Sequence, residues 1–235
     1  EVKNLTTCFR TSTGNVTVVD DVSFSLKKGE TLCIVGESGC GKSVSALSIM
    51  GLLPPSGYVK YGSANFQNNN LLSMSSNQLE RLRGDRISMI FQDPGSSLNP
   101  VMRIGDQVSE IFRIHLNMSK RESLEKALEM LRQVEIPDPE SRMLAYPHEL
   151  SGGMAQRVMI AMALSCNPDI LIADEPTTAL DVTIQSQILN LMIQMQLKTK
   201  TAILLITHDL GVVAEIADNV LEMYCDFSYY TQVMS

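Results

Sequence analysis

The sequence predicts an α/β fold with a mostly parallel sheet covered by helices on both faces, an N-terminal antiparallel β subdomain and an inserted α-helical subdomain. Three observations predict it. Short apolar runs end in glycine or polar residues, helical periodicity separates several of them, and residues 99–149 contain helical patterns with no convincing strand. Strands that alternate with helices favour a parallel sheet. A length of 235 residues suits one large domain or two small ones.

The composition is that of a globular protein, and it argues against several classes. Hydrophobic residues make up 44% of the chain, which is enough for a packed core. A net charge of −7 without a basic run of five or more residues argues against binding of duplex nucleic acid as the main activity. The longest apolar runs are too short to cross a bilayer, and no signal peptide opens the chain. Because there is no initiator Met, we expect the native start to lie upstream.

The five cysteines are scattered and contain no CxxC pair. This pattern favours free thiols in a reducing compartment over a metal site or a disulfide framework. The three histidines also lie far apart in the sequence, which argues against a metal site built from protein ligands alone.

The first elements are predicted from alternation and from one apolar run. "EVKNLTTCF" and "VTVVDDVSFSL" alternate like antiparallel strands joined by "STGN". "TLCIVG", Thr31 to Gly36, predicts a buried strand, and a helix is expected from Ser43 through Met50. "NFQNNN", Asn65 to Asn70, is predicted to be a short polar loop.

Three more buried strands are predicted from apolar runs. They cover residues 86–92, 169–174 and 202–208. An amphipathic helix is expected between the last two, because apolar residues recur at i, i+4, i+7, i+8 and i+11. These residues are Ile184, Ile188, Leu191, Met192 and Met195.

The predicted insertion begins with a helix whose apolar residues are Ile104, Val108, Ile111 and Phe112. The next helix opens at "SKRE", where Ser119 is expected to cap the helix and Glu122 to complete a capping box. It should stop before Pro137.

"GESGCGKS", Gly36 to Ser43, fits the phosphate-binding pattern G-x-x-x-x-G-K-S/T between a predicted strand and a predicted helix. Its glycines allow backbone N–H groups to turn inward around phosphate oxygens. Lys42 is expected to reach the β- and γ-phosphates, and Ser43 to ligate Mg²⁺. An ordinary glycine-rich turn is the alternative. The expected nucleotide-binding residues are Gly36, Glu37, Ser38, Gly39, Cys40, Gly41, Lys42, Ser43 and Val44.

"ILIADEP", Ile170 to Pro176, is an apolar strand that ends in two carboxylates. Asp174 at the strand tip is expected to hold Mg²⁺, directly or through water. Glu175 is expected to face the γ-phosphate and to orient or deprotonate the attacking water. A solvated Asp-Glu-Pro turn is the common alternative, but Lys42 and Ser43 in the same chain favour the catalytic interpretation.

Two more polar residues end predicted strands. His208 is expected at the same sheet edge as Asp174, where open α/β sheets bind ligands, and to contact the γ-phosphate rather than fill a structural role. Gln92 could ligate Mg²⁺ or the attacking water, although an amide at a strand end is weak evidence alone.

"LSGGMAQR", residues 150–157, is a second candidate phosphate turn. A Ser and two Gly stand directly before a helix expected from Met154 onward, which is the chemistry of an anion-binding helix N-terminus. The sequence therefore raises the question of why one chain carries two such turns.

The motifs in this order resemble the nucleotide-binding subunit of ATP-binding-cassette (ABC) transporters, over roughly residues 1 to 223. They are Walker A "GESGCGKS", Q-loop "FQDP", signature "LSGGMAQR", Walker B "ILIADEP", D-loop "TALD" and H-loop "THD". The resemblance implies a P-loop NTPase (RecA-like) core. "FQDPGSSLNPVMRIGDQVSE" and "DEPTTALDVTIQ" are similar to oligopeptide and dipeptide importers, whose relatives also import nickel and glutathione.

The resemblance implies ATP hydrolysis with Mg²⁺ held by Ser43, Gln92 and Asp174. It implies that Ser151, Gly152 and Gly153 contact the nucleotide of a partner cassette, which answers the question of the second turn. Asp181 is implied as the D-loop residue. Phe9 is the candidate for stacking on adenine, and a core Phe is the alternative.

The implied partners are a second cassette, as a homodimer or heterodimer, two membrane-spanning permeases and, indirectly, an extracytoplasmic solute-binding protein. The implied location is the cytoplasmic face of a prokaryotic cell membrane. The helical insertion is where we expect a permease to dock, although these helices could merely cover the core. A soluble non-transport ABC ATPase and a catalytically silent cassette are the rival classes.

We expect an ATPase core with its β subdomain at residues 1–98 and 165–223, and a helical subdomain with the signature helix at 99–164. Residues 224–235 depart from the family pattern. The family has a glycine-containing turn and another strand there, and "YCDFSYYTQVMS" matches neither. We therefore expect a truncated or atypical tail, to which no iron–sulfur cluster of a longer extension can be carried over.

Overall fold

The computed structural model describes residues 1–177, 180–224 and 232–233, and the chain forms two compact units. The first unit comprises Glu1–Arg83 and Ile203–Ser235, and the second comprises Gly84–Ala202. No helix within the described residues is long and apolar enough to span a membrane.

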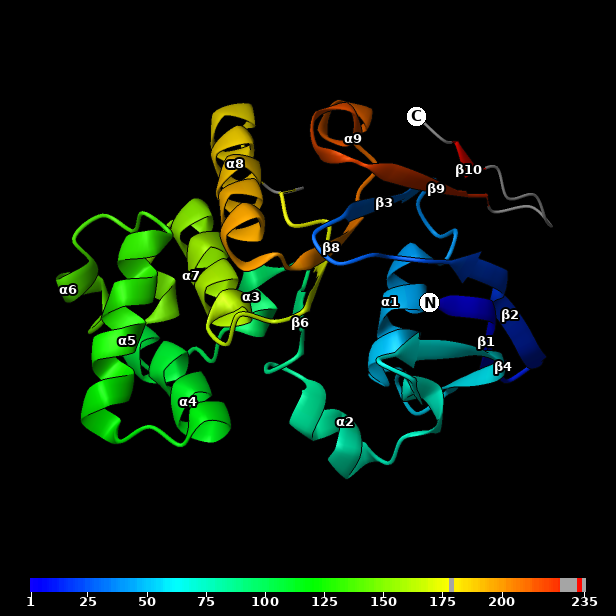
Figure 1. Ribbon diagram of the computed structural model, residues 1–235, viewed down its shortest axis with the longest axis horizontal. Coiled ribbons are helices and arrows are strands. Elements are labelled where there is room, and N and C mark those ends of the chain that lie inside the picture. The colour runs from blue at the N-terminus through cyan, green and yellow to red at the C-terminus, as the bar shows by residue number, and fades with distance from the viewer. Residues whose placement is uncertain (178–179, 225–231, 234–235) are drawn as a thin grey trace. The chain divides into compact units, whose positions relative to one another are not determined.

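The first unit contains an antiparallel sheet with the strand order β2-β1-β4-β5 (Figure 1). Its strands are β1 (Val2–Thr11), β2 (Gly14–Phe24), β4 (Gly57–Phe66) and β5 (Asn69–Asn70). The β1–β2 pair confirms the predicted N-terminal hairpin. Buried Leu5, Val19 and Val22 form its apolar side.

The polar loop predicted at Asn65 to Asn70 is wrong. Asn65 and Phe66 end β4, and they pair with Asn70 and Asn69 of β5. The reversal between them needs only Gln67 and Asn68, which have φ of 48° and 67°. Two successive left-handed residues make the tight turn that suits the twist of a hairpin, and Asn tolerates that conformation better than most residues.

The first unit also contains parallel strands. β3 (Thr31–Gly36) lies between β8 (Ala202–Ile206) and β9 (Asn219–Met223) and is parallel to both. β10 (Gln232–Val233) pairs antiparallel with β9. The described part of the tail thus contributes a two-residue strand, and the expectation of a truncated or atypical tail stays a prediction. An edge strand such as β9 offers unpaired backbone groups that the returning chain can satisfy. The residues between Tyr224 and Gln232 lie outside the described part of the chain.

Helix α1 (Lys42–Met50) follows β3 and is held at its C-terminus by Arg83. The guanidinium donates from Nε and Nη2 to the Met50 carbonyl, over 2.9 and 2.6 Å, and from Nη2 to the Gly51 carbonyl over 2.9 Å. These carbonyls have no partner within the helix, so a cation there satisfies them. The unit also contains η1 (Leu71–Ser73), α2 (Ser76–Leu82) and α9 (Leu210–Ile216).

In the second unit, β6 (Ile87–Ile90) and β7 (Ile170–Asp174) pair in parallel. Arg86 forms an ion pair with Asp169, 2.5 Å between Nη2 and Oδ2, where the two strands begin. The strands predicted from apolar runs are confirmed, but β6 and β8 end two residues earlier than the predicted ranges. In each unit, the polar residues that follow these strands leave the sheet ladder and form loops that carry candidate site residues.

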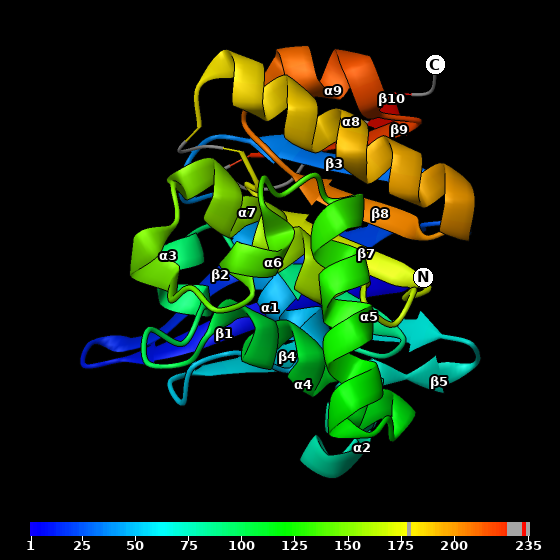
Figure 2. The ribbon, with the colours of Figure 1, turned by 90° about the vertical axis from the view of Figure 1, so that its left-hand side faces the viewer.

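The helices of the second unit are mostly those predicted. They are α3 (Pro94–Ser97), α4 (Ile104–Leu116), α5 (Lys120–Gln133), α6 (Pro139–Arg142), η2 (Pro147–Glu149), α7 (Gly152–Leu164) and α8 (Val182–Thr199). Residues 99–149, all of which are described, contain no strand. Helices α4, α5 and α7 pack on one another, as Figures 1 and 2 show.

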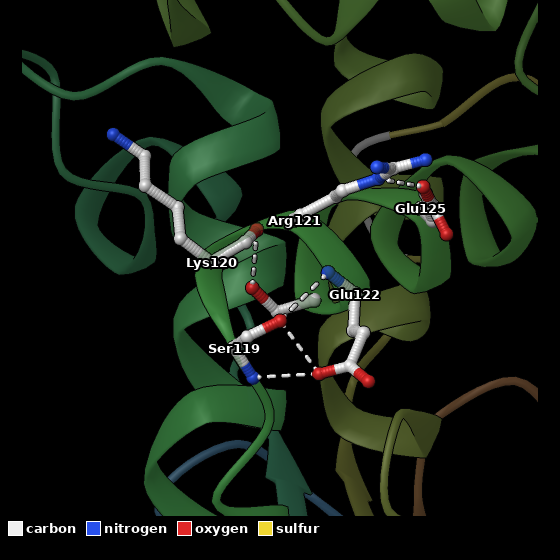
Figure 3. A network of polar contacts seen from close by, with 6 residues as sticks. Ser119, Lys120, Arg121, Glu122 and Glu125 are labelled. Atoms are coloured by element: carbon white, nitrogen blue, oxygen red, sulfur yellow. Dashed lines mark hydrogen bonds and ion pairs between the residues drawn. The ribbon is translucent and has the colours of Figure 1, made fainter.

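The predicted capping box of α5 is confirmed (Figure 3). The Glu122 carboxylate accepts from the Ser119 backbone N–H over 3.0 Å and from its hydroxyl over 2.6 Å. The Ser119 hydroxyl oxygen in turn accepts from the Glu122 N–H over 3.3 Å. Two N–H groups that the helix leaves unpaired are thereby satisfied.

The four described cysteines are free. Burial raises the pKa of Cys33 to about 12, with a smaller contribution from Asp218, and it raises the pKa of Cys166 to about 11, with a smaller contribution from Asp85. These two thiols are therefore protonated and weakly reactive at neutral pH. Cys225 lies outside the described residues.

Candidate functional site

The phosphate-binding loop lies in the first unit, directly after β3. Gly39 and Gly41 have φ of 87° and 94°, a left-handed conformation that glycine adopts without strain. A Cβ on Gly41 would lie 2.6 Å from the Val18 carbonyl oxygen, whereas one on Gly39 would meet nothing within 4 Å. Strand β2 therefore packs against the backbone of Gly41, and this position requires glycine for space as well as for conformation.

Lys42 is buried, with 6% of its surface exposed, and its ammonium group lies inside the loop. Its Nζ donates to the carbonyls of Gly36 over 2.7 Å and Glu37 over 2.8 Å. Helix α1 begins at Lys42, and its N-cap residue is Gly41, which makes no side-chain cap bond. A helix N-terminus beside a buried cation is suited to bind an anion such as phosphate.

His208 follows β8 by two residues, and the phosphate-binding loop follows β3. Because β3 and β8 are parallel neighbours, with Ile34 opposite Ile206, the two loops leave the same edge of the sheet in this unit. His208 is exposed, and the next residue, Asp209, caps α9 through the Gly211 N–H over 2.8 Å. His208 therefore follows the carboxyl end of its strand, and its expected contact with a γ-phosphate stays a prediction.

The second unit brings Gln92, Asp174 and Glu175 together. Ile90 of β6 is opposite Ala173 of β7, so the residues that follow the two strands leave one edge. Gln92 Nε2 donates to Glu175 Oε2 over 3.1 Å. Asp174 is the last residue of β7 and is buried, with 6% exposed. Glu175 has a φ of 46°, a left-handed conformation that is costly for a residue with a Cβ and that clusters at functional sites.

The signature sequence differs from its prediction in one respect. Helix α7 begins at Gly152 rather than Met154, so the two glycines form its first turn. Ser151 is the N-cap residue, and its Oγ accepts from the Met154 N–H over 3.3 Å. A Cβ on Gly153 would lie 3.0 Å from Ile184 Cγ2 of α8, which shows how closely the two helices approach.

Asp181 is the N-cap of α8, where its Oδ1 accepts from the Ile184 N–H over 3.0 Å. The D-loop begins at Thr178, and Thr178 and Ala179 lie outside the described residues. Asp181 thus has a structural role that the sequence analysis did not assign to it.

Phe9, the candidate for adenine stacking, lies in β1 opposite Val16 and Gly57. Its half-buried ring covers Gly57, since a Cβ there would lie 3.1 Å from Phe9 Cε1. A glycine opposite an aromatic residue leaves space for the ring to lie against the backbone. The stacking role stays a prediction.

The predicted magnesium ligands are all oxygen donors, which is what Mg²⁺ prefers. Asp174 and Gln92 follow neighbouring strands of the second unit, and Ser43 lies in the first turn of α1 in the first unit. The described residues contain no group of three or more His, Cys, Asp or Glu side chains suited to a metal. This donor set fits an ion that binds few protein ligands and completes its shell with phosphate and water.

Comparison with protein families now identifies the chain. The family model described as "ABC transporter" matches residues 19–178. The chain belongs to the ABC transporter family. It is 55% identical over 223 residues to the oligopeptide transport ATP-binding protein OppD of Escherichia coli K12, covering 95% of this chain and 66% of that protein. It is 57% identical over 224 residues to the dipeptide transport ATP-binding protein DppD of Bacillus subtilis 168, covering 95% and 67%.

This ABC cassette is also similar to a solved structure described as a dimeric post-hydrolysis state of the ATP-binding cassette MJ0796 bound to ADP and Pi. The TM-score is 0.87 at 27% identity, over 100% of this chain and 98% of that one. The predicted α/β fold of the P-loop NTPase type is thereby confirmed. The chain spans about two thirds of the length of the curated relatives that it matches.

Arg157, in the signature sequence, has a role that the sequence analysis did not predict. It is buried at 7% exposure, and its guanidinium donates to groups on two other segments of the second unit. The only indication of this role in the sequence is a basic residue directly before an apolar run.

Proposed function

We propose that this chain is the ATP-binding and ATP-hydrolysing subunit of an ABC importer for peptides or a related small solute. The observation that carries the proposal is that the Walker A, Q-loop, Walker B and H-loop groups each follow the carboxyl end of a strand. The loop of Lys42 follows β3, His208 follows β8, Gln92 follows β6 and Glu175 follows β7. The relatives at 55% and 57% identity are transport ATP-binding proteins for oligopeptides and dipeptides.

The reaction we propose is ATP and water to ADP and phosphate. The loop from Gly36 to Ser43 binds the phosphates through its N–H groups, and Lys42 exchanges its bonds to loop carbonyls for bonds to phosphate oxygens. Glu175 orients the attacking water and accepts its proton, and His208 contacts the γ-phosphate. Phosphoryl transfer depends on positioning and charge stabilisation more than on covalent chemistry, and these groups supply both.

Magnesium fits this set of residues. Ser43, Gln92 and Asp174 would hold the ion, which neutralises developing charge on the phosphates when bound. Gln92 donates to Glu175 through Nε2, so the same side chain could offer its Oε1 to the ion while it keeps this hydrogen bond.

We also propose that the cassette works as a dimer, in which Ser151, Gly152 and Gly153 face the nucleotide of the partner. Ser151 is exposed at the start of α7, and the first-turn N–H groups of a helix attract anions. The MJ0796 cassette, which is described as dimeric, supports this arrangement. The partner cassette would be a second copy or a related chain.

A permease surface is proposed on the helical part of the second unit. Val101 and Leu144 are large apolar residues with 79% and 63% exposure. Their segments are tied together, since the N–H groups of Ile104 and Gly105 donate to the carbonyls of Ala145 and Met143, both over 2.9 Å. Two exposed apolar residues on segments held together in this way suit a short amphipathic helix of a membrane subunit.

The buried Gln107 fixes the loop that presents Val101. Its Nε2 donates to the carbonyls of Asn99 and Met102, both over 3.0 Å, and its Oε1 accepts from the Asn99 N–H over 2.8 Å. The proposed location, on the cytoplasmic face of a prokaryotic membrane, follows from docking to two such permeases. An extracytoplasmic solute-binding protein would deliver the solute.

The test is assembly and activity together. The full-length chain is expressed with two permeases and a solute-binding protein of a peptide importer, purified and placed in lipid vesicles. We expect co-purification with both permeases and ATP hydrolysis that rises when the binding protein and a peptide are added. Hydrolysis without any permease association would favour a soluble ABC ATPase, and an absence of hydrolysis would contradict the proposed enzyme.

A further inference from the structure

Arg157 connects the signature helix α7 to two other segments of the second unit. Its Nη1 donates to the Val134 carbonyl over 2.8 Å and lies 3.4 Å from the Glu135 carboxylate. Its Nη2 donates to Gln187 Oε1 of α8 over 2.9 Å. A buried guanidinium is costly unless it is paired and hydrogen-bonded, and these contacts supply such partners.

The contact with α8 has a defined register. Gly153 lies against Ile184, and Arg157, one turn further along α7, reaches Gln187, about one turn further along α8. The two helices therefore run side by side in the same direction from their N-termini, and they are adjacent in Figure 1. The contact of Gly153 with Ile184 is apolar and close, and the hydrogen bond from Arg157 to Gln187 is polar and directional. Together they fix the rotation of α7 relative to α8 as well as the distance between the two helices.

The contact with α5 is equally specific. Helix α5 ends at Gln133, and Glu135 adopts a left-handed conformation with φ of 56°. The carbonyl of Val134, just past the helix end, is left for Arg157. A left-handed residue after a helix is a common way to end it, and the exposed carbonyls then need donors. Arg157 is that donor for Val134.

We propose that Arg157 is a positioning residue for the phosphate-facing end of α7. Through Gln187 it holds Ser151, Gly152 and Gly153 in a fixed orientation relative to Asp181, which caps α8. The inference rests on the proposed dimer, in which both helix N-termini face the partner. Arg157 itself touches no substrate. Loss of the Arg157 guanidinium should leave nucleotide binding by the isolated chain intact. It should slow ATP hydrolysis, which needs the signature turn.

The decisive variant is Gln187→Leu, because Gln187 is exposed and the change removes only the acceptor on α8. Gln194→Leu, an exposed residue of the same helix, is the matched control. Arg157→Met removes all of the contacts, and its control is Arg121→Met, whose only described ion pair is the exposed one with Glu125 (Figure 3). Arg157→Lys can keep one donor and should restore part of the function.

Three measurements are made on the full chain. Hydrogen–deuterium exchange on the isolated chain should rise at the first turn of α7 in Gln187→Leu and Arg157→Met, and in neither control. The Kd for ATP of the isolated chain should stay unchanged. In the transporter assembled with its permeases, kcat for ATP should fall roughly tenfold, the loss expected when a charge-assisted hydrogen bond is removed from a working geometry.

Unchanged exchange at α7 in Gln187→Leu would overturn the proposal. So would normal kcat in both variants, or an ATP affinity that falls in parallel with kcat, which would indicate a general defect. Ser151→Arg separates the two levels of inference. If that change stops turnover while Gln187→Leu and Arg157→Met do not, the positioning role alone fails. If Ser151→Arg also leaves turnover normal, the proposed trans role of the signature turn fails.

Discussion

Gln92 Nε2 donates a hydrogen bond to Glu175 Oε2 over 3.1 Å, and the two residues follow neighbouring parallel strands of one unit. The contact joins the residue proposed to ligate the metal to the residue proposed to activate water. The hydrogen bond orients the carboxylate that would accept the proton of the water. The contact thus links the position of the Q-loop to the orientation of the proposed base.

The first prediction concerns this base. Glu175→Gln should retain the Kd for ATP and lose turnover by about 10²–10⁴-fold, the usual contribution of a positioned base. An amide cannot accept the proton of the water, although it keeps the size of the side chain. Equilibrium ATP binding and steady-state hydrolysis measure the two effects. Glu149→Gln, on η2, is the control for a carboxylate outside the strand ends. Near-normal hydrolysis in Glu175→Gln would show that Glu175 is not the general base.

Ser151 has two roles that substitution can separate, as N-cap of α7 and as a proposed phosphate contact. Ser151→Asp keeps a capping oxygen, so the melting temperature should stay close to that of the native chain. Its negative charge would face the γ-phosphate of the partner, so ATP-dependent dimerisation and turnover should be lost. Ser151→Ala should lower stability by about 1 kcal/mol because the Met154 N–H loses its acceptor.

Thermal unfolding and sedimentation with ATP distinguish these outcomes. For sedimentation, the chain carries Glu175→Gln, so that hydrolysis does not dissociate the proposed dimer. Normal turnover in Ser151→Asp would show that the serine faces no phosphate.

The third prediction compares two glycines of the phosphate-binding loop. Both have positive φ, so alanine costs each about 1–2 kcal/mol. Only at Gly41 would the added Cβ clash with backbone, at 2.6 Å from the Val18 carbonyl oxygen. Gly41→Ala should therefore weaken ATP binding and lower the melting temperature more than Gly39→Ala does. Isothermal titration with ATP and thermal unfolding test this order, and equal effects would mean that contact with β2 is unimportant.

The fourth prediction concerns pH and the capping box of α5. The hydroxyl of Ser119, followed by its backbone N–H, lowers the pKa of Glu122 in the folded chain. A carboxyl whose folded pKa lies below its unfolded value stabilises the native state above the unfolded pKa, about 4.3. That contribution is lost as the pH falls through the folded value. The protection of the α5 backbone amides from hydrogen exchange should therefore decline as the pH falls from the unfolded toward the folded pKa.

Ser119→Ala removes the larger cause of the shift. In this variant the pKa of Glu122 should rise toward its usual value, and the acid-dependent part of the α5 protection should shrink. NMR titration of the Glu122 side chain measures the first effect directly. Glu125, on the same helix, is the internal reference, and a Glu122 titration unaffected by Ser119→Ala would contradict the assignment.

Local signals in the sequence were enough for most elements and for the positions of the candidate site residues on them. The capping box at Ser119 and Glu122 could be predicted because it depends on residues three positions apart. The phosphate-binding loop could be predicted because its glycine spacing reflects backbone conformations that few sequences need. The strand tips carrying Gln92, Asp174, Glu175 and His208 followed from apolar runs that end in polar residues.

Features that depend on distant segments could not be predicted. The start of α7 at Gly152 was missed because glycine is a poor helix former, and contact with Ile184 of α8 outweighs that propensity. The Asn65–Asn70 hairpin was missed because its polar composition resembles a loop, while its pairing depends on the rest of the sheet. Strand β10 was missed because its partner, β9, offers an edge that composition does not reveal.

The sequence by itself determined which chemical groups this cassette carries and in what order, because motif spacing reflects short-range backbone geometry. The tertiary structure decided how those groups are held. The ring of Phe9 against Gly57, the bond from Gln92 to Glu175 and the contacts of Arg157 with Val134 and Gln187 join residues far apart in the chain. Such contacts depend on packing and on satisfying buried polar groups, which no local pattern encodes.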